Sequence, residues 1–443
     1  MIPAGWVRLW GIAVVAHIVG NARWGQLVPD PTTLGVSTFA LLVLAVVLVL
    51  APGERPVLVA VSIGVIVVAW LEAPYLGNHW QLAALVSIAV LVALTRPDQW
   101  GWFAPVGRWM LLGFYVWAAF AKLNSAFLDP AVSCGLEYAN RSLASWGLPT
   151  IASTSVVAWL PVLGAVGIEM AVPLLLILRR TRTFGVILAV GFHGLVSLDL
   201  DQHFYDFTSV LFALFVLFLS DDVRQRLTDR LVLRRVGPFV LVAGLVGLVG
   251  LMPLGPTSFY LVRIGAFVVW IPYLAWMVVG VIRARGGGVQ EGQLRVRSVA
   301  GVGLVAVVVG IGLLPYLEVR TATSWNMYSN LRTVDGESNH VLVRSTFPLT
   351  DHQSRIVTLL ETEDEGLAVY VDSGYGLTER RFLHYLSEHP DVEVRYEVGG
   401  AERTARGADV GVRLGVVSEK LQLFRAIDLT TPTRCQTTWM PAR

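Results

Sequence analysis

Three ionisable side chains stand inside or at the edge of long apolar stretches of this 443-residue chain. Lys122 ends the run GFYVWAAFAK, His79 opens a run in GNHW, and His193 lies within VGFHGLVSLDL. An ionised group at the centre of a membrane helix costs at least ~2.5 kcal/mol, so such residues usually face a protein interior or a wet cavity. Amines and imidazoles in such places can move protons, which points to general acid–base chemistry.

Lysine is rare in this chain, and this sharpens the interpretation of Lys122. Of 34 basic residues, only Lys122 and Lys420 are lysine. A lysine at the end of a membrane helix can extend its ammonium to the headgroups, but arginine does so equally well and is the usual basic residue here. A buried lysine can lose its proton, whereas a guanidinium cannot. We therefore predict that Lys122 is a general base.

Three further polar residues accompany this set in the apolar stretches, namely His17, Asn78 and Glu169. His17 lies in the second half of the first stretch, Asn78 precedes His79, and Glu169 lies deeper, in GIEMAVPLL. Each has a structural alternative, because histidines and carboxylates in membrane helices also hydrogen-bond neighbouring helices. Their positions predict one polar cavity that opens to the outer leaflet.

The stretch DLDQH, residues 199–203, has the residue types of a metal site. Three ligands in a loop without a partner cluster form a weak pattern, so we interpret it as a solvated loop and predict no metal. The net charge of +2 and the lack of a basic tract with interleaved aromatics also argue against a nucleic-acid partner.

The composition assigns most of the chain to a lipid bilayer. Hydrophobic residues make up 55% and charged residues 15%, which is too apolar for a soluble protein of this length. Eleven apolar runs are long enough, or nearly so, to cross about 30 Å of hydrocarbon. They are residues 6–22, 34–51, 57–74, 80–95, 106–123, 152–178, 183–198, 205–220, 237–253, 258–282 and 298–317. We expect the first to remain as a membrane helix rather than a cleaved signal.

Arginine placement sets the expected orientation in the cell membrane. If the loops alternate between sides, one side carries sixteen arginines and the other three. The positive-inside rule then puts the N-terminus in the cytoplasm and the chain after residue 317 outside.

After residue 317 the apolar runs become shorter and are separated by polar turns. Residues 318–443 therefore predict a small extracytoplasmic α+β domain that follows a transmembrane domain of residues 1–317. Its apolar runs have strand length, in HVLVRSTF, IVTLLET, GLAVYVD and VEVRYEV, and LTERRFLHYLSEH has helical spacing with Thr378 as N-cap. Cys134 and Cys435 both face the outer, oxidising side, so a disulfide between them is a candidate. Sequence leaves the pairing open.

Short motifs in the first half of the chain resemble the vitamin K-dependent gamma-glutamyl carboxylases. YVWAAFAKLNSAFL followed by GLEYANRSLASWGLP is similar to the segment in which an aromatic-rich helix of that family ends in lysine and leucine. NHW resembles the family's Asn-His motif before a membrane helix, and GFHGLVSLDL its Phe-His helix. The matches keep the family's order over residues 6–220. The wider group is the HTTM superfamily, whose bacterial members the stretch WNMYSNLRTVDGESNHVLV resembles.

The resemblance implies a quinone-dependent carboxylase. Lys122 would deprotonate a reduced naphthoquinone of the vitamin K or menaquinone type, so that oxygen can react and generate a strong base. His79 would stabilise the reactive oxyanions, with His193 in support. That base would remove a proton from a glutamate side chain of a secreted peptide, to which carbon dioxide adds. The residues expected at the cofactor site are Asn78, Glu169 and His17.

Two departures leave a second function open. The family's doubled lysine is Ala121-Lys122 here, and the C-terminal domain is much smaller than in the carboxylases. The alternative is a non-catalytic HTTM protein that binds or matures a secreted polypeptide. A transporter is less favoured, because paired broken helices are missing from the pattern.

Overall fold

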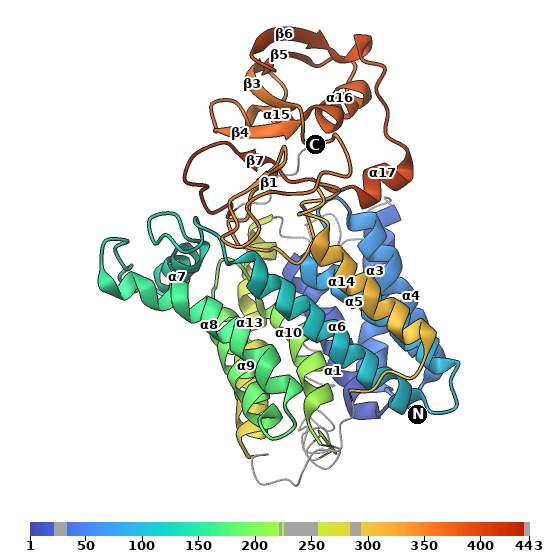
Figure 1. The fold of residues 1–443 in the computed structure, drawn as a ribbon. Helices are drawn as coiled ribbons and strands as arrows, with labels where there is room; N and C mark the ends of the chain where they lie inside the picture. The colour runs from blue at the N-terminus through green and yellow to red at the C-terminus, as the bar shows by residue number, and fades with distance from the viewer. Residues whose placement is uncertain (22–32, 221–223, 226–255, 284–293, 438–443) are drawn as a thin grey trace.

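The computed structural model of the protein describes residues 1–21, 33–220, 224–225, 256–283 and 294–437. A bundle of long helices carries a small sheet domain on one end, which we call the domain side of the bundle (Figure 1). The bundle helices are α1 (Ala4–Asn21), α3 (Thr33–Leu50), α4 (Arg55–Glu72), α5 (Asn78–Leu94), α6 (Gln99–Ala121), α7 (Cys134–Ser145), α8 (Trp159–Ile177), α9 (Arg182–Val196), α10 (Tyr205–Phe215), α13 (Pro256–Arg283) and α14 (Val299–Leu313).

Ten of the eleven expected apolar segments coincide with helices, and the segment 237–253 lies outside the described residues. Five helices in the described part are long and apolar enough to cross a membrane, by length and composition. They are Thr33–Leu50, Arg55–Glu72, Gln99–Ala121, Val156–Ile177 and Gly265–Arg283. Shorter apolar helices of 10–17 residues lie among them, so the described helices are compatible with a multipass membrane protein, and eleven crossings stay a prediction.

The helices expose apolar rather than polar faces. Val43 and Val47 on α3 and Leu163 and Leu174 on α8 are exposed, whereas a soluble helix would carry charged residues there. Polar residues gather at helix starts instead: Asp98 accepts a hydrogen bond from the backbone N–H of Gly101 and caps α6. The surface of the bundle therefore suits hydrocarbon.

The C-terminal domain is built on a five-stranded antiparallel sheet with strand order β6-β5-β3-β4-β7. Its elements are β1 (Thr333–Val334), β2 (Glu337–Ser338), β3 (Ile356–Thr362), α15 (Glu365–Ala368), β4 (Tyr375–Thr378), α16 (Glu379–Glu388), β5 (Glu393–Val398), β6 (Ala401–Arg406), α17 (Val416–Leu421) and β7 (Ile427–Asp428). Phe382 and Leu386 on α16 are buried in one core with Val357 and Leu359 of β3. One helix face thus covers the sheet.

The expected elements of this domain were partly right. The predicted strands IVTLLET and VEVRYEV are β3 and β5, and the predicted helix is α16, with Thr378 at its N-cap position. GLAVYVD is not a strand, because Leu367 and Tyr370 are buried three residues apart on a helical turn. HVLVRSTF contributes only isolated bridges. Strands β4 and β6 were not predicted.

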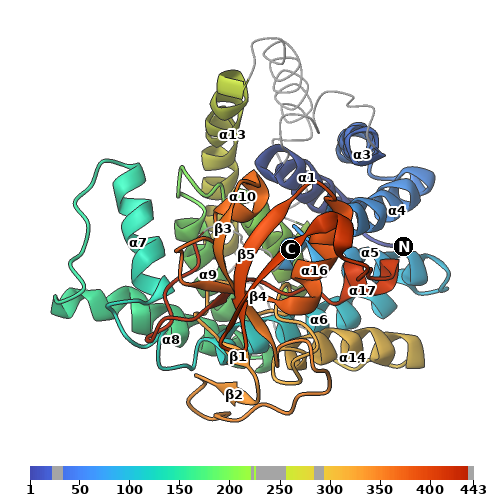
Figure 2. The ribbon, with the colours of Figure 1, turned by 90° about the horizontal axis from the view of Figure 1, so that it is seen from above.

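The domain is anchored in the bundle by a loop, residues 321–330, that penetrates the helical core. Trp325 is fully buried, and its indole N–H donates to the backbone oxygen of Val308 on α14 at 2.7 Å. Seen from above, the sheet lies over the middle of the bundle, while α7 and α13 extend beyond it (Figure 2). The domain is therefore a lid over the central helices.

A disulfide joins the first residue of α7 to the end of the described chain. Cys134 and Cys435 are 301 residues apart in sequence and are bonded, which confirms the candidate pairing. Next to the bridge, Asn330 accepts a hydrogen bond from the Cys134 backbone N–H at 2.8 Å, and Arg141 donates to Thr437 at 3.0 Å. The C-terminal segment thereby ties α7 to the domain.

The bridge predicts a simple labelling result. The chain has only two cysteines, so the native protein should not react with a maleimide reagent, and reduction should expose two thiols per chain. Replacing Cys435 by Ser should lower the free energy of unfolding by about 2–5 kcal/mol, measured by denaturant titration. Labelling of unreduced, folded protein would contradict the pairing.

Candidate functional site

An apolar cavity of about 360 Å³ lies between α6, α7, α8, α9 and the loop 321–330. Its wall is formed largely by aromatic and aliphatic side chains, including Phe114, Phe127, Ile168, Phe192, Phe204 and Phe207. Lys122, Glu169 and His193 also line it. An apolar hollow with a few polar groups is the usual form of a small-molecule site.

Lys122 forms an ion pair with Glu169 in this wall. The Lys122 Nζ lies 2.7 Å from a carboxylate oxygen of Glu169, and Lys122 is only 5% exposed. The pair links the end of α6 to the middle of α8. A buried ion pair is costly to break, because the remaining partner is left as an uncompensated charge.

The direction of the Lys122 side chain decides against the headgroup interpretation. Lys122 is the C-cap residue of α6, and its Nζ donates to the backbone oxygen of Ala118, one turn back, at 3.3 Å. The ammonium thus points into the bundle rather than away from its end. The neighbouring Ala121 faces elsewhere, into a cluster with Tyr316 and Leu331.

His193 occupies the cavity wall opposite, next to Tyr115. The Tyr115 hydroxyl and the His193 Nε2 form a short hydrogen bond, and both side chains are buried. The His193 Nδ1 has no hydrogen-bond partner within the described part of the chain. Its ring lies against Phe207, with 5.2 Å between ring centroids. His193 and Lys122 therefore share one cavity.

The cavity reaches the apolar surface of the bundle. Leu160 on α8 and Leu195 on α9 both line it and are 71% and 70% exposed. On the domain side it is lined by Met327 and Tyr328. A lipid-soluble molecule can thus enter sideways between α8 and α9.

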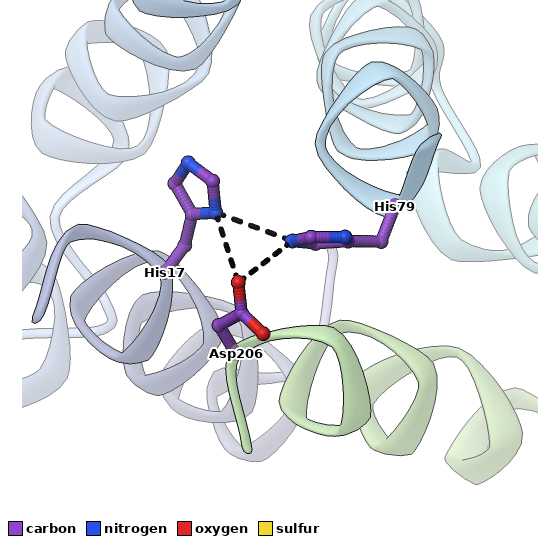
Figure 3. A group of neighbouring side chains, drawn as sticks. All are labelled: His17, His79 and Asp206. Atoms are coloured by element: carbon purple, nitrogen blue, oxygen red, sulfur yellow. Dashed lines mark hydrogen bonds and ion pairs between the residues drawn. The ribbon is translucent and has the colours of Figure 1, made fainter. Parts of the chain in front are cut away.

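His79 and His17 lie in a second polar cluster, outside the cavity lining. His79 Nε2 lies 3.1 Å from Asp206 Oδ2 and 3.3 Å from His17 Nδ1, and His17 Nε2 lies 3.4 Å from Glu72 (Figure 3). All four groups are mostly buried and come from α1, α4, α5 and α10. Phe207 lies between this cluster and the cavity, because its ring contacts both His79 and His193.

Asn78 lies in neither group. Its side-chain oxygen accepts a hydrogen bond from the backbone N–H of Trp325 at 2.8 Å, so it holds the loop 321–330 in the bundle. The structure therefore brings Lys122, Glu169 and His193 together and gives Asn78 a positioning role.

The interpretation of DLDQH as a solvated loop was wrong for its first and last residues, whereas Asp201 is exposed. Asp199 and His203 are 1% and 2% exposed, and Asp199 lines the cavity. Asp199 accepts hydrogen bonds from the backbone N–H groups of Asp201 and Gln202, and burial raises the pKa of its carboxyl. The backbone donors of the loop satisfy one oxygen of the buried carboxylate, Oδ1, whereas Oδ2 has no hydrogen-bond partner within the described residues.

Two residues of these clusters were missed at the sequence level. Tyr115 precedes Lys122 by seven residues, or two helical turns, so that spacing places both on one face of α6. Asp206 stands in the first turn of an otherwise apolar helix, which is itself a signal of function. Both were detectable, but their partners were not.

No protein family, curated protein or solved structure matches this chain.

The Lys122–Glu169 pair predicts a distinctive stability pattern. Replacing Lys122 alone by Met should cost about 3–5 kcal/mol, because Glu169 is left buried and unpaired. Combining it with Glu169→Leu should recover most of that loss, in unfolding experiments on purified protein in detergent.

The exposed pair Arg141–Glu137 on α7 provides the control. Glu137→Gln should change stability by less than about 1 kcal/mol. If Lys122→Met behaves like this control, the buried ion pair does not exist in the protein.

Proposed function

We propose that this protein is an integral membrane enzyme that binds a reduced quinone in the apolar cavity, with the Lys122–Glu169 pair accepting a proton from it. The observation that carries the proposal is that the Lys122–Glu169 ion pair, which can exchange protons, lies in the wall of an apolar cavity that opens to the side of the bundle. The resemblance of the Lys122, His79 and His193 segments to vitamin K-dependent carboxylases and HTTM proteins is consistent with it.

The residues present fit a naphthoquinone head group. Flat aromatic side chains line a volume of about 360 Å³, within the range of small-molecule sites, and the opening is rimmed by Leu160 and Leu195. Phe114, Phe207 and Phe192 would pack against the ring system, and an isoprenoid tail would leave between α8 and α9. Once bound, a reduced quinone would supply acidic hydroxyl groups and reactivity toward oxygen.

The ion pair changes how Lys122 acts. An ammonium held by a carboxylate cannot accept a proton, so Lys122 alone is not the base in this state. The pair as a unit accepts one proton. The ammonium proton passes to the Glu169 carboxylate, and the freed Lys122 amine takes the proton of the substrate, which leaves a single positive charge on Lys122. That charge lies beside the oxygen anion formed on the substrate, where a low dielectric strengthens the attraction. Tyr115 and His193 are hydrogen-bonded to each other, so with a neutral imidazole one of the two can donate a hydrogen bond to that anion.

The domain side of the bundle would face outward, as arginine placement predicts. The second substrate, a secreted peptide or a small molecule, would then approach past the C-terminal domain and the loop that carries Met327 and Tyr328. A non-catalytic role in binding or maturation of a secreted polypeptide is the alternative, in which the pair only fastens α6 to α8.

Oxidation of an added reduced menaquinone in the presence of oxygen tests the proposal. Wild-type protein in lipid nanodiscs should accelerate the reaction above protein-free discs, followed by absorbance and product chromatography. Lys122→Ala and Lys122→Arg should both lower the rate by at least about 10²-fold, because arginine keeps the charge but cannot release its proton.

A double variant with Lys122→Glu and Glu169→Lys exchanges the two charges. It separates a catalytic role of the pair from a structural role that only holds α6 against α8. It keeps opposite charges on the two helices, so the protein should remain folded, but it moves the amine and should lose activity. If this variant or Lys122→Arg keeps the full rate, the pair is structural only.

A further inference from the structure

The cluster of His17, His79 and Asp206 presents three ligand atoms to one point. We propose that it binds a divalent cation of the zinc type, in a site separate from the cavity. The candidate ligands are His17 Nδ1, His79 Nε2 and a carboxylate oxygen of Asp206, which Figure 3 shows pointing toward one another. This inference does not depend on the proposed function.

The spacing of the three atoms suits zinc. The two histidine nitrogens are 3.3 Å apart, and Asp206 Oδ2 lies 3.1 Å from His79 and 3.8 Å from His17. A point equidistant from all three lies about 2.0 Å from each, which is the length of a zinc bond to nitrogen or oxygen. Two imidazoles, one carboxylate and an open fourth position form a common zinc ligand set.

Glu72 orients the first of these ligands. Its carboxylate lies 3.4 Å from His17 Nε2, on the far side of the ring from the cluster. A proton on Nε2 that is donated to Glu72 leaves the lone pair on Nδ1, directed at the proposed ion. Such a carboxylate behind a metal-bound histidine is the usual supporting contact. The ring is also stacked on Trp80, with centroids 3.7 Å apart, so its plane is fixed.

A divalent cation would neutralise the two acidic side chains of the cluster. Asp206 and Glu72 each carry one negative charge when ionised, and both lie within an apolar bundle. A divalent cation between neutral imidazoles gives a net charge of zero, which a membrane interior favours. Two protonated imidazoles would supply the same charge, but at 3.3 Å apart they would repel each other.

Glycines leave the room that the cluster needs. A Cβ at Gly20 of α1 would lie 3.1 Å from the Asp206 Cβ, and one at Gly77 would lie 2.9 Å from the His79 ring. The absence of a side chain at each position lets α1 and α10 approach and lets the imidazole turn inward. The bound ion would fasten α1, α5 and α10 at their domain-side ends and hold Phe207 against His193.

The donor set favours zinc or another first-row transition metal, such as iron(II), over the hard cations. Neutral imidazoles with a carboxylate suit zinc, whereas calcium and magnesium prefer oxygen ligands alone. The cluster contains no thiolate or thioether, which copper(I) prefers.

Metal analysis of the purified full-length protein tests the site. We expect about one zinc ion per chain by mass spectrometry, lost after dialysis against a chelator and regained on addition of zinc, with a higher unfolding temperature. Cobalt(II) added to the stripped protein should give the visible absorption of a low-symmetry four-coordinate site. Protein that neither retains zinc nor binds added zinc or cobalt would overturn the proposal.

Variants separate this site from adventitious binding. His17→Ala and Asp206→Asn should abolish zinc retention, while Glu72→Gln, which keeps all three ligands, should weaken zinc affinity about 10–100-fold. His203→Gln removes another buried histidine near the start of α10 and should keep the zinc. Equal zinc in all of these variants shows adventitious metal only. The measured quantity is metal content, so a failure of this test can be distinguished from a failure of the quinone-oxidation test.

Discussion

The ion pair between Lys122 and Glu169 is the interaction on which the candidate site depends. It places a full positive and a full negative charge in the wall of an apolar cavity, where neither is stable alone. The pair fixes the end of α6 against the middle of α8 and turns the lysine inward. Under the proposed function, it also accounts for a lysine at the end of this helix, since an arginine could hold the carboxylate but could not give up its proton.

The two polar groups of the bundle are neighbours without being one site. Phe207 contacts both the His193 ring and the His79 ring, so the cavity and the histidine cluster are separated by one side chain. Asn78, next to His79, holds the loop 321–330, and Met327 and Tyr328 of that loop line the cavity. The disulfide then ties that lid to α7, another wall of the cavity. The loop, the domain and the disulfide therefore all contribute to the shape of the cavity.

Much of the fold followed from the sequence, because a run of apolar residues of helical length has few other solutions. The contacts between the polar side chains could not be predicted from the sequence in the same way. Placing His17, His79 and Lys122 at one end of the bundle needs only the alternation of spans, whereas their division into two clusters depends on the rotation of each helix about its axis. The sheet shows the same limit: β6, AERTAR, is an exposed edge strand with no apolar alternation to detect. GLAVYVD looked like a strand because its apolar residues are contiguous, but burial three residues apart made it a turn of helix.

The central claim is that the cavity beside Lys122 holds a quinone, and lipid mass spectrometry of purified protein tests it most directly. Gly164 on α8 lines the cavity and has open space where a Cβ would lie, while Gly167 on the same helix has open space but lies outside the lining. Wild-type protein and Gly167→Leu should both co-purify with a naphthoquinone, and Gly164→Leu should lose it because the leucine fills the cavity. No naphthoquinone in the wild type, or an equal amount in all three proteins, would contradict the account.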